Sequence, residues 1–168
     1  MVALGFILLA IGVLYLTRRT VTTVLQKVLL DDAVYRLATA MAKFETGVRS
    51  PGPFPLNPSL WQGFAARNNN PGNLVYAGQR GAILGEGGFA KFASPVDGWN
   101  ALLAEVRNDI TKPAAFAGDA PGPTGTLLQF IQAFSKTDQA AYAAFVSGEL
   151  GISMVTRFTE WVDYGFQV

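Results

Sequence analysis

The chain has 168 residues, 50% of them apolar and 12% aromatic, which is enough for one packed domain with an appendage. Its formal net charge of +1 gives no electrostatic reason to expect a nucleic-acid partner. Cysteine and histidine are absent, which excludes disulfides, thiol chemistry, Ser-His-Asp triads and His- or Cys-ligated zinc. We therefore expect no metal and no cofactor, and any chemistry must rest on Asp, Glu, Lys, Tyr or Ser.

The N-terminal segment begins with an uncharged apolar run, residues 2–16, which is followed directly by Arg18 and Arg19. A helix of this length covers roughly 22 Å, and snorkelling arginines or a thin bilayer would make up the difference to a hydrocarbon core of ~30 Å. The run lacks the basic start and the cleavage site of a secretory signal. We expect a retained transmembrane helix; the alternative is a buried helix in a multi-chain assembly.

An apolar stripe at helical spacing extends this helix beyond the arginines. It is made up of Val21, Val24, Leu25, Val28 and Leu29. The predicted organisation is therefore a membrane anchor with an amphipathic extension over residues 1–30 and a globular domain over residues 31–168.

An amphipathic helix is predicted from Asp31 or Asp32 to Glu45, because acidic residues favour its start and apolar residues recur at helical spacing. Glu45 falls on the apolar face at the C-terminal end, where the helix dipole disfavours a carboxylate, and Gly47 follows as a natural stop. Glu45 is therefore the leading candidate for chemistry. The structural alternative is a glutamate paired with Arg49 or Lys43.

The next region reads as loops and a small β-element. Residues 50–59 hold four prolines and predict a constrained loop, with Trp61 a candidate for the rim of a binding cleft. Residues 67–74, RNNNPGNL, form a dense turn-forming cluster. Residues 74–76 predict a short strand, and the glycine-rich residues 78–88 predict a flexible hairpin that returns through residues 89–92.

The remainder predicts helices. Ser94, Pro95 and Asp97 form a strong helix start, and apolar residues continue that helix to Ile110. A linker over residues 113–125 precedes a helix over residues 126–134, and a further helix runs from residue 137 to near residue 148 or 151. Ser153 is expected to cap the last helix. With Trp99 and Trp161 assigned to the core, this predicts about five helices around a minor hairpin, a mainly helical α+β domain.

The order of these motifs resembles that of virion-associated lytic transglycosylases of bacteriophages, including the membrane-anchored type of membrane-containing phages. The resemblance covers roughly residues 33 to 155. It rests on the acid in KFE-x-G at residues 43–47, on RNNNPGNL, and on the segment GF-x-x-F-x-S-x-x-x-GW at residues 88–99.

The resemblance implies a lysozyme-like fold with Glu45 as the catalytic glutamate. The turn that forms the floor of the family's sugar cleft matches Asn70, Gly72, Asn73 and Leu74. Tyr76 and Gln79 lie beside that turn, and Tyr142 matches an aromatic residue near the cleft. These residues are the expected substrate-binding set.

The implied reaction is cleavage of the β-1,4 bond between N-acetylmuramic acid and N-acetylglucosamine in peptidoglycan. A hydrolase normally needs a second carboxylate, for which the candidates are Glu86 and the helix-capping Asp97. A lone acid suits a lytic transglycosylase, in which Glu45 protonates the leaving oxygen and then takes the proton of the muramic acid C6 hydroxyl.

The expected partners are a peptidoglycan glycan strand, a membrane through residues 2–16, and other virion proteins. The expected setting is a membrane-associated protein of a phage virion that acts in the host periplasm and opens the wall when the genome enters. Two alternatives stay open on the same fold: a catalytically inactive structural or membrane protein of the virion, and a peptidoglycan-binding module.

Overall fold

The computed structural model describes residues 26–112 and 121–163. The predicted anchor at residues 2–16, the stripe as far as Leu25 and most of the 113–125 linker lie outside these residues. Within the described ranges, no helix is long and apolar enough to cross a membrane.

Residues 26–46 form one continuous helix, here called the central helix. It does not begin at Asp31 or Asp32, since residues 26–30 already belong to it. Asp31 pairs with Arg107 of the helix at residues 95–111, at 2.6 Å. The boundary predicted between residues 30 and 31 therefore falls inside a helix. The helix ends as predicted: Thr46 Oγ1 donates to the Ala42 carbonyl at 2.6 Å, and Gly47 adopts a φ of +74° that favours glycine.

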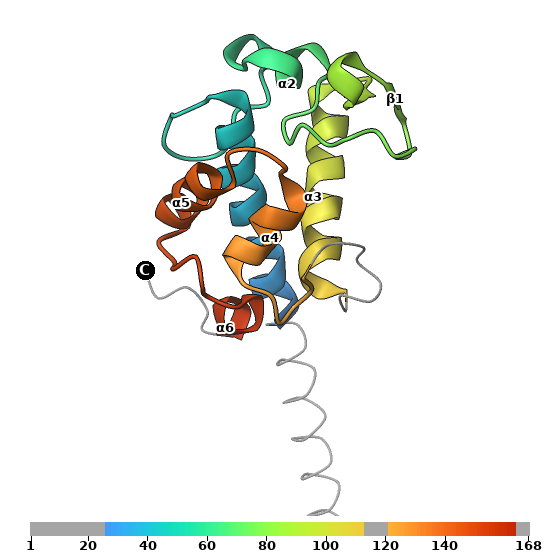
Figure 1. The fold of residues 1–168 in the computed structure, drawn as a ribbon. Coiled ribbons are helices and arrows are strands. Elements are labelled where there is room, and N and C mark those ends of the chain that lie inside the picture. The colour runs from blue at the N-terminus through green and yellow to red at the C-terminus, as the bar shows by residue number, and fades with distance from the viewer. Residues whose placement is uncertain (1–25, 113–120, 164–168) are drawn as a thin grey trace, which may run out of the picture.

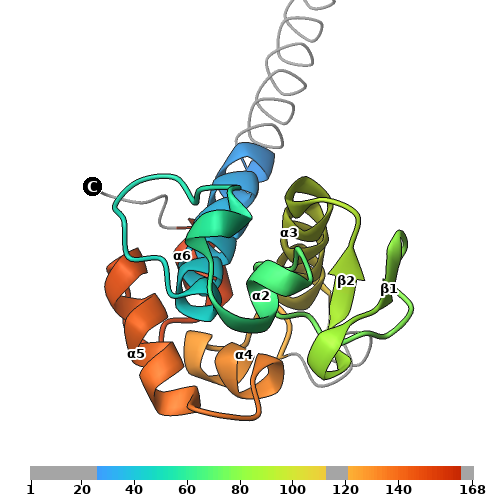
Figure 2. The same ribbon diagram turned by 90° about the horizontal axis from the view of Figure 1, so that it is seen from above.

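The other helices pack around the central helix (Figures 1 and 2). α3 (Pro95–Thr111) lies on one side, and α5 (Gln139–Leu150) lies on the other with α4 (Leu127–Phe134) nearby. The predicted start of α3 is confirmed, since the Ser94 side chain accepts from the Asp97 N–H and Pro95 is the first helical residue. α4 begins with a capping box between Thr126 and Gln129.

The last helix, α6 (Phe158–Asp163), starts later than predicted. Ser153 does not cap it. Residues 154 and 155 instead form a turn, which the Thr156 N–H closes by donating to the Ser153 carbonyl at 3.0 Å. The N–H groups of Leu128 and Leu127 donate to the carbonyls of Met154 and Thr156, at 2.9 and 3.2 Å, and so tie this segment to the start of α4. This pairing between segments distant in sequence uses the backbone that a helix would have needed.

The β-element is a hairpin of β1 (Ala82–Leu84) and β2 (Ala90–Phe92), with Ile83 opposite Lys91 and the short 3₁₀ helix η2 (Glu86–Gly88) between the strands. β1 lies in the stretch predicted to be a hairpin, residues 78–88, and β2 lies in the predicted return at residues 89–92. The strand expected at residues 74–76 is reduced to a single bridge between Val75 and Phe89. The structure confirms a mixed architecture of helices with a small antiparallel sheet.

The loop between the central helix and the hairpin contains η1 (Pro58–Leu60) and α2 (Gly63–Arg67), neither of which was predicted. Trp61 in this loop is 6% exposed, packs on Phe54, and donates its indole N–H to the Pro55 carbonyl at 2.9 Å. It is a core residue and not a cleft-rim residue, so that expectation is wrong. Trp99 and Trp161 are buried, as predicted.

Candidate functional site

Glu45 lies in the last turn of the central helix, and its side chain is half-buried. Burial is the largest influence on its carboxyl group and raises its pKa above the ordinary value of 4.5, while Asn73 and Tyr142 partly offset that rise. A carboxyl group in this setting keeps its proton to a higher pH than a solvated one. Glu45, Asn73 and Tyr142 are referred to below as the Glu45 cluster.

Asn73 holds the Glu45 carboxylate directly. Its Nδ2 donates to Glu45 Oε2 at 2.8 Å. The backbone of Asn73 is left-handed, with a φ of +46°, a conformation that asparagine tolerates better than most residues. The other side-chain atom, Oδ1, is buried and has no hydrogen-bond partner among the described residues.

Tyr142 approaches Glu45 from α5. Its ring is fully buried and stacks on Phe44, with centroids 4.1 Å apart and planes 15° apart. Burial first, and then the neighbouring Glu45 charge, raise the pKa of this phenol well above 10.0. The interaction between the hydroxyl and Glu45 raises the pKa of Tyr142 and lowers that of Glu45. Asn73 Oδ1 is then the atom of the cluster that is buried without a partner among the described residues.

Three of the other predicted site residues build the turn that carries Asn73. Asn70 is fully buried: its Nδ2 donates to the carbonyls of Leu74 and Ala90, at 3.0 and 2.8 Å, and its Oδ1 accepts from the Leu74 N–H at 3.0 Å. Gly72 lies so close to α3 that a Cβ would meet the Leu102 side chain at 2.6 Å. Leu74 is part of the core. These residues position Asn73 and do not contact the carboxylate themselves.

Tyr76 and Gln79 lie on the segment that follows the turn. Tyr76 is exposed, and Gln79 stabilises its own loop by donating to the Val75 carbonyl at 2.6 Å and accepting from the Ala77 N–H at 2.9 Å. Neither side chain hydrogen-bonds to Glu45 in the described structure. Of the seven residues predicted to accompany Glu45, the structure therefore brings Asn73 and Tyr142 to it.

The candidate second carboxylates are engaged elsewhere. Glu86 Oε2 accepts from Arg67 Nε at 2.6 Å, and Asp97 Oδ2 accepts from Ser94 Oγ at 2.7 Å. Both carboxylates are exposed. Among the described residues, no group of three or more Asp, Glu, His or Cys side chains is placed to bind a metal ion.

The sequence did not predict the role of Asn68, which holds the hairpin in position. Asn68 is 1% exposed, and its side chain donates to the Glu86 carbonyl and accepts from the Glu86 N–H, each at 3.0 Å. It therefore fastens the hairpin to the asparagine-rich turn. The RNNNPGNL motif marks this region as unusual, but nothing in the sequence assigns separate roles to its asparagines.

Comparison of the chain with known families, with curated proteins and with solved structures gave no match. The chemistry of the Glu45 cluster is therefore the basis for a functional proposal.

Proposed function

We propose that the chain is a peptidoglycan lytic transglycosylase with a lysozyme-like domain and that Glu45 is its catalytic acid. The bond cleaved is the β-1,4 linkage between N-acetylmuramic acid and N-acetylglucosamine. The observation that carries this proposal is the half-buried Glu45 carboxyl, whose pKa is raised and which is held by an asparagine in a left-handed conformation.

Glycosidic cleavage needs a proton on the leaving oxygen, so the acid has to stay protonated near neutral pH. Burial favours the protonated form of Glu45, by the same physical route that raises the pKa of the catalytic glutamate in lysozyme. In the proposed reaction the Glu45 proton moves to the glycosidic oxygen as the C1–O bond breaks. The C6 hydroxyl oxygen then bonds to C1 and gives its proton to the Glu45 carboxylate, which yields a 1,6-anhydro sugar without consuming water.

Within the described ranges, no second carboxylate contributes to the pKa shift of Glu45, and this favours the route over hydrolysis. Retaining and inverting hydrolases place their two carboxyl groups about 5 to 9.5 Å apart. Burial and the neighbouring Glu105 raise the pKa of Asp109 to about 7, but it belongs to the far end of α3. That end is tied by Arg107 to Asp31, roughly 21 Å from Glu45 along the central helix at about 1.5 Å per residue.

The unpartnered Asn73 Oδ1 supports a polar ligand. Buried oxygen atoms without hydrogen bonds are rare in native proteins and call for an explanation. A hydroxyl or N-acetyl N–H of a sugar bound against Glu45 would give this atom a partner. In the proposal, Asn73 is a positioning residue for Glu45 as well as a ligand for the sugar.

The proposed setting is a membrane-associated phage virion protein that opens the host wall when the genome enters, alongside other virion proteins. This part of the proposal rests on the sequence. The basic residues that follow residues 2–16 would keep the rest of the chain in the cytoplasm of a cell under the positive-inside rule. A virion protein avoids this conflict because it meets the wall from outside.

One observation favours a second candidate, a peptidoglycan-binding module. A surface hollow of about 530 Å³ is lined by the opposite side of the central helix and not by Glu45. A binding module would retain affinity for the wall but would not break glycosidic bonds.

The test is digestion of purified bacterial sacculi by the full chain in mild detergent, with soluble products identified by mass spectrometry. We expect release by the wild type and a loss of about a thousandfold in Glu45→Gln, since general acids typically contribute 10² to 10⁴. Glu105→Gln, which removes an exposed glutamate from α3, is the matched control and should behave as wild type. Binding to sacculi without release by any of the three proteins would refute the enzyme and leave the binding module.

A further inference from the structure

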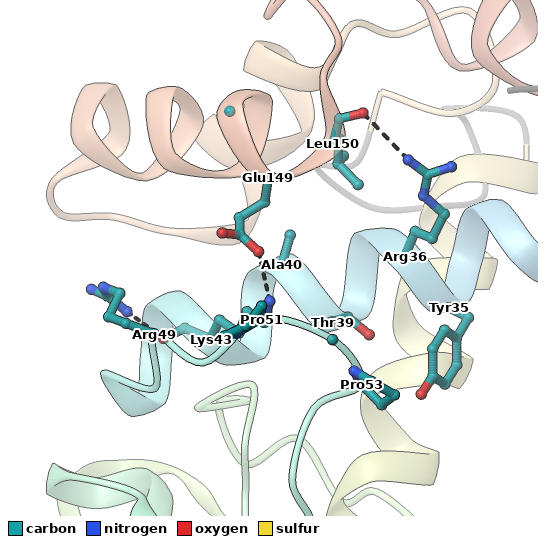
Figure 3. Close-up of a pocket in the computed structure, with 12 residues that line it drawn as sticks. Tyr35, Arg36, Thr39, Ala40, Lys43, Arg49, Pro51, Pro53, Glu149 and Leu150 are labelled. Carbon is teal, nitrogen blue, oxygen red and sulfur yellow. Dashed lines mark hydrogen bonds and ion pairs between the residues drawn. The ribbon is translucent and has the colours of Figure 1, made fainter. Parts of the chain in front are cut away.

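A hollow of about 530 Å³ lies between the central helix, the loop at residues 49–53 and the C-terminal end of α5 (Figure 3). We call it the basic pocket. Its lining includes Arg36, Lys43, Arg49, Glu149, Tyr35 and Pro53.

The basic pocket is separate from the Glu45 cluster. Successive residues of an α-helix are about 100° apart, so Lys43 and Glu45 point roughly 200° apart, to opposite sides of the central helix. The two sites therefore share a helix but not a surface.

Positive charge dominates the pocket. Three cationic side chains line it, those of Arg36, Lys43 and Arg49, against one carboxylate, that of Glu149. Lys43 is 5% exposed and its ammonium group meets Glu149 Oε2 at 2.7 Å, as Figure 3 shows. Because lysine is almost never buried without a partner, this ion pair explains why the Lys43 side chain can be buried. Among the lining residues, cationic side chains therefore outnumber carboxylates by three to one.

The guanidinium groups are held in place by the protein itself. Arg49 Nη1 donates to the carbonyls of Lys43 and Val48, at 2.7 and 3.1 Å, and the group lies 4.6 Å from the centre of the Phe145 ring. Arg36 Nη2 donates to the Leu150 carbonyl at 3.5 Å. A guanidinium fixed before binding loses little entropy when an anion arrives, and its flat fork suits a carboxylate.

The rest of the lining is suited to a peptide. Tyr35 and Pro53 contribute apolar surface, which a free inorganic anion would not use. Thr39, also on the wall, has a buried hydroxyl without a hydrogen-bond partner in the described ranges. The combination of fixed cations and apolar rings matches a short chain that carries carboxylates.

We propose that the basic pocket binds an acidic peptide, namely the carboxylate-bearing peptide stem of peptidoglycan; this inference rests on the proposed function. Binding there would hold the wall against the protein while the Glu45 cluster acts on a glycan strand. The pocket should thus affect the apparent affinity for sacculi, through KM, and leave kcat unchanged.

The test is calorimetric titration of the full chain with the free stem tripeptide L-Ala–γ-D-Glu–diaminopimelate, and separately with inorganic phosphate at the same ionic strength. We expect saturable binding of the tripeptide by the wild type and about tenfold weaker binding by Arg36→Gln, the loss of one charged contact. Glu149→Gln removes the competing carboxylate but keeps an acceptor for Lys43, so it should bind the tripeptide several-fold more tightly. A purely structural Lys43–Glu149 pair would give no such gain.

No saturable binding by the wild type, or binding that neither charge variant changes, would overturn the proposal. Phosphate binding as tight as that of the tripeptide would overturn the assignment to a peptide. Glu45→Gln separates this proposal from the proposed function. If it binds the tripeptide normally while no protein cleaves sacculi, the enzyme proposal fails and the pocket stands; cleavage without tripeptide binding gives the reverse.

Discussion

The two sides of the central helix treat a buried charge in opposite ways. Lys43, on one side, is matched by Glu149 at 2.7 Å, so its charge is kept and neutralised. Glu45, on the other side, meets an amide and a phenol, and no cation of the described residues contributes to its pKa, which burial raises. A matched pair favours a permanent charge, whereas a neutral polar setting favours a group that exchanges protons. The proposals accordingly assign binding to the first side of the helix and acid chemistry to the second.

The largest effect on stability should come from breaking the matched pair. Glu149→Ala leaves the Lys43 ammonium buried without its partner, and we expect a loss of about 2 kcal/mol in the free energy of unfolding. This lies below the usual range for buried pairs because Glu149 is partly exposed. Chemical denaturation is the measurement, and Glu149→Gln, which retains an acceptor, should lose less. Equal losses in the two variants would mean that packing and not charge explains the contact.

A smaller effect, on activity, is expected from removing the amide that holds Glu45. The Asn73 amide donates to Glu45 at 2.8 Å, and this hydrogen bond lowers the Glu45 pKa. Asn73→Ala removes the hydrogen bond, so the Glu45 pKa should rise further. We expect about a tenfold loss of sacculus digestion, the equivalent of one hydrogen bond to a charged group, with the basic limb of the pH–rate profile shifted to higher pH. An unshifted profile would show that Asn73 acts only on folding.

The smallest effect concerns the pH dependence of stability. Because the pKa of Glu45 is higher in the folded chain than the ordinary 4.5, the folded state binds more protons, and stability is lost as pH rises from about 4.5 through the raised pKa. Asp109, whose pKa is also raised, gives the same pH dependence of stability, but it is present in both the wild type and Glu45→Gln. The wild type should therefore lose more stability than Glu45→Gln between pH 4 and pH 8, measured by urea unfolding. Parallel curves would contradict the burial of an ionisable Glu45.

The parts of the fold that were predicted correctly depend on local signals. Ser94 and Pro95 start α3, and Gly47 ends the central helix, because capping and left-handed turns are decided by a few adjacent residues. Glu45 stood out for a similar reason: a carboxylate on an apolar helical face is visible from spacing alone.

The parts that were missed depend on partners distant in sequence. The late start of α6 follows from the pairing of residues 154–157 with the start of α4, and the burial of Trp61 follows from its contacts with Phe54 and Pro55. The basic pocket joins residues 35–43 and 49–53 to residues 148–150. Local patterns contain no information on such contacts, which tertiary packing decides.

The central claim is that a single acid, Glu45, cleaves peptidoglycan without water. The most direct measurement is digestion of sacculi by the full chain in water enriched in ¹⁸O, with the muropeptides analysed by mass spectrometry. The proposal predicts 1,6-anhydro products that carry no ¹⁸O and are absent from the Glu45→Gln digest. Reducing ends labelled with ¹⁸O would contradict it, because a water molecule and a base to activate it would then take part in the reaction.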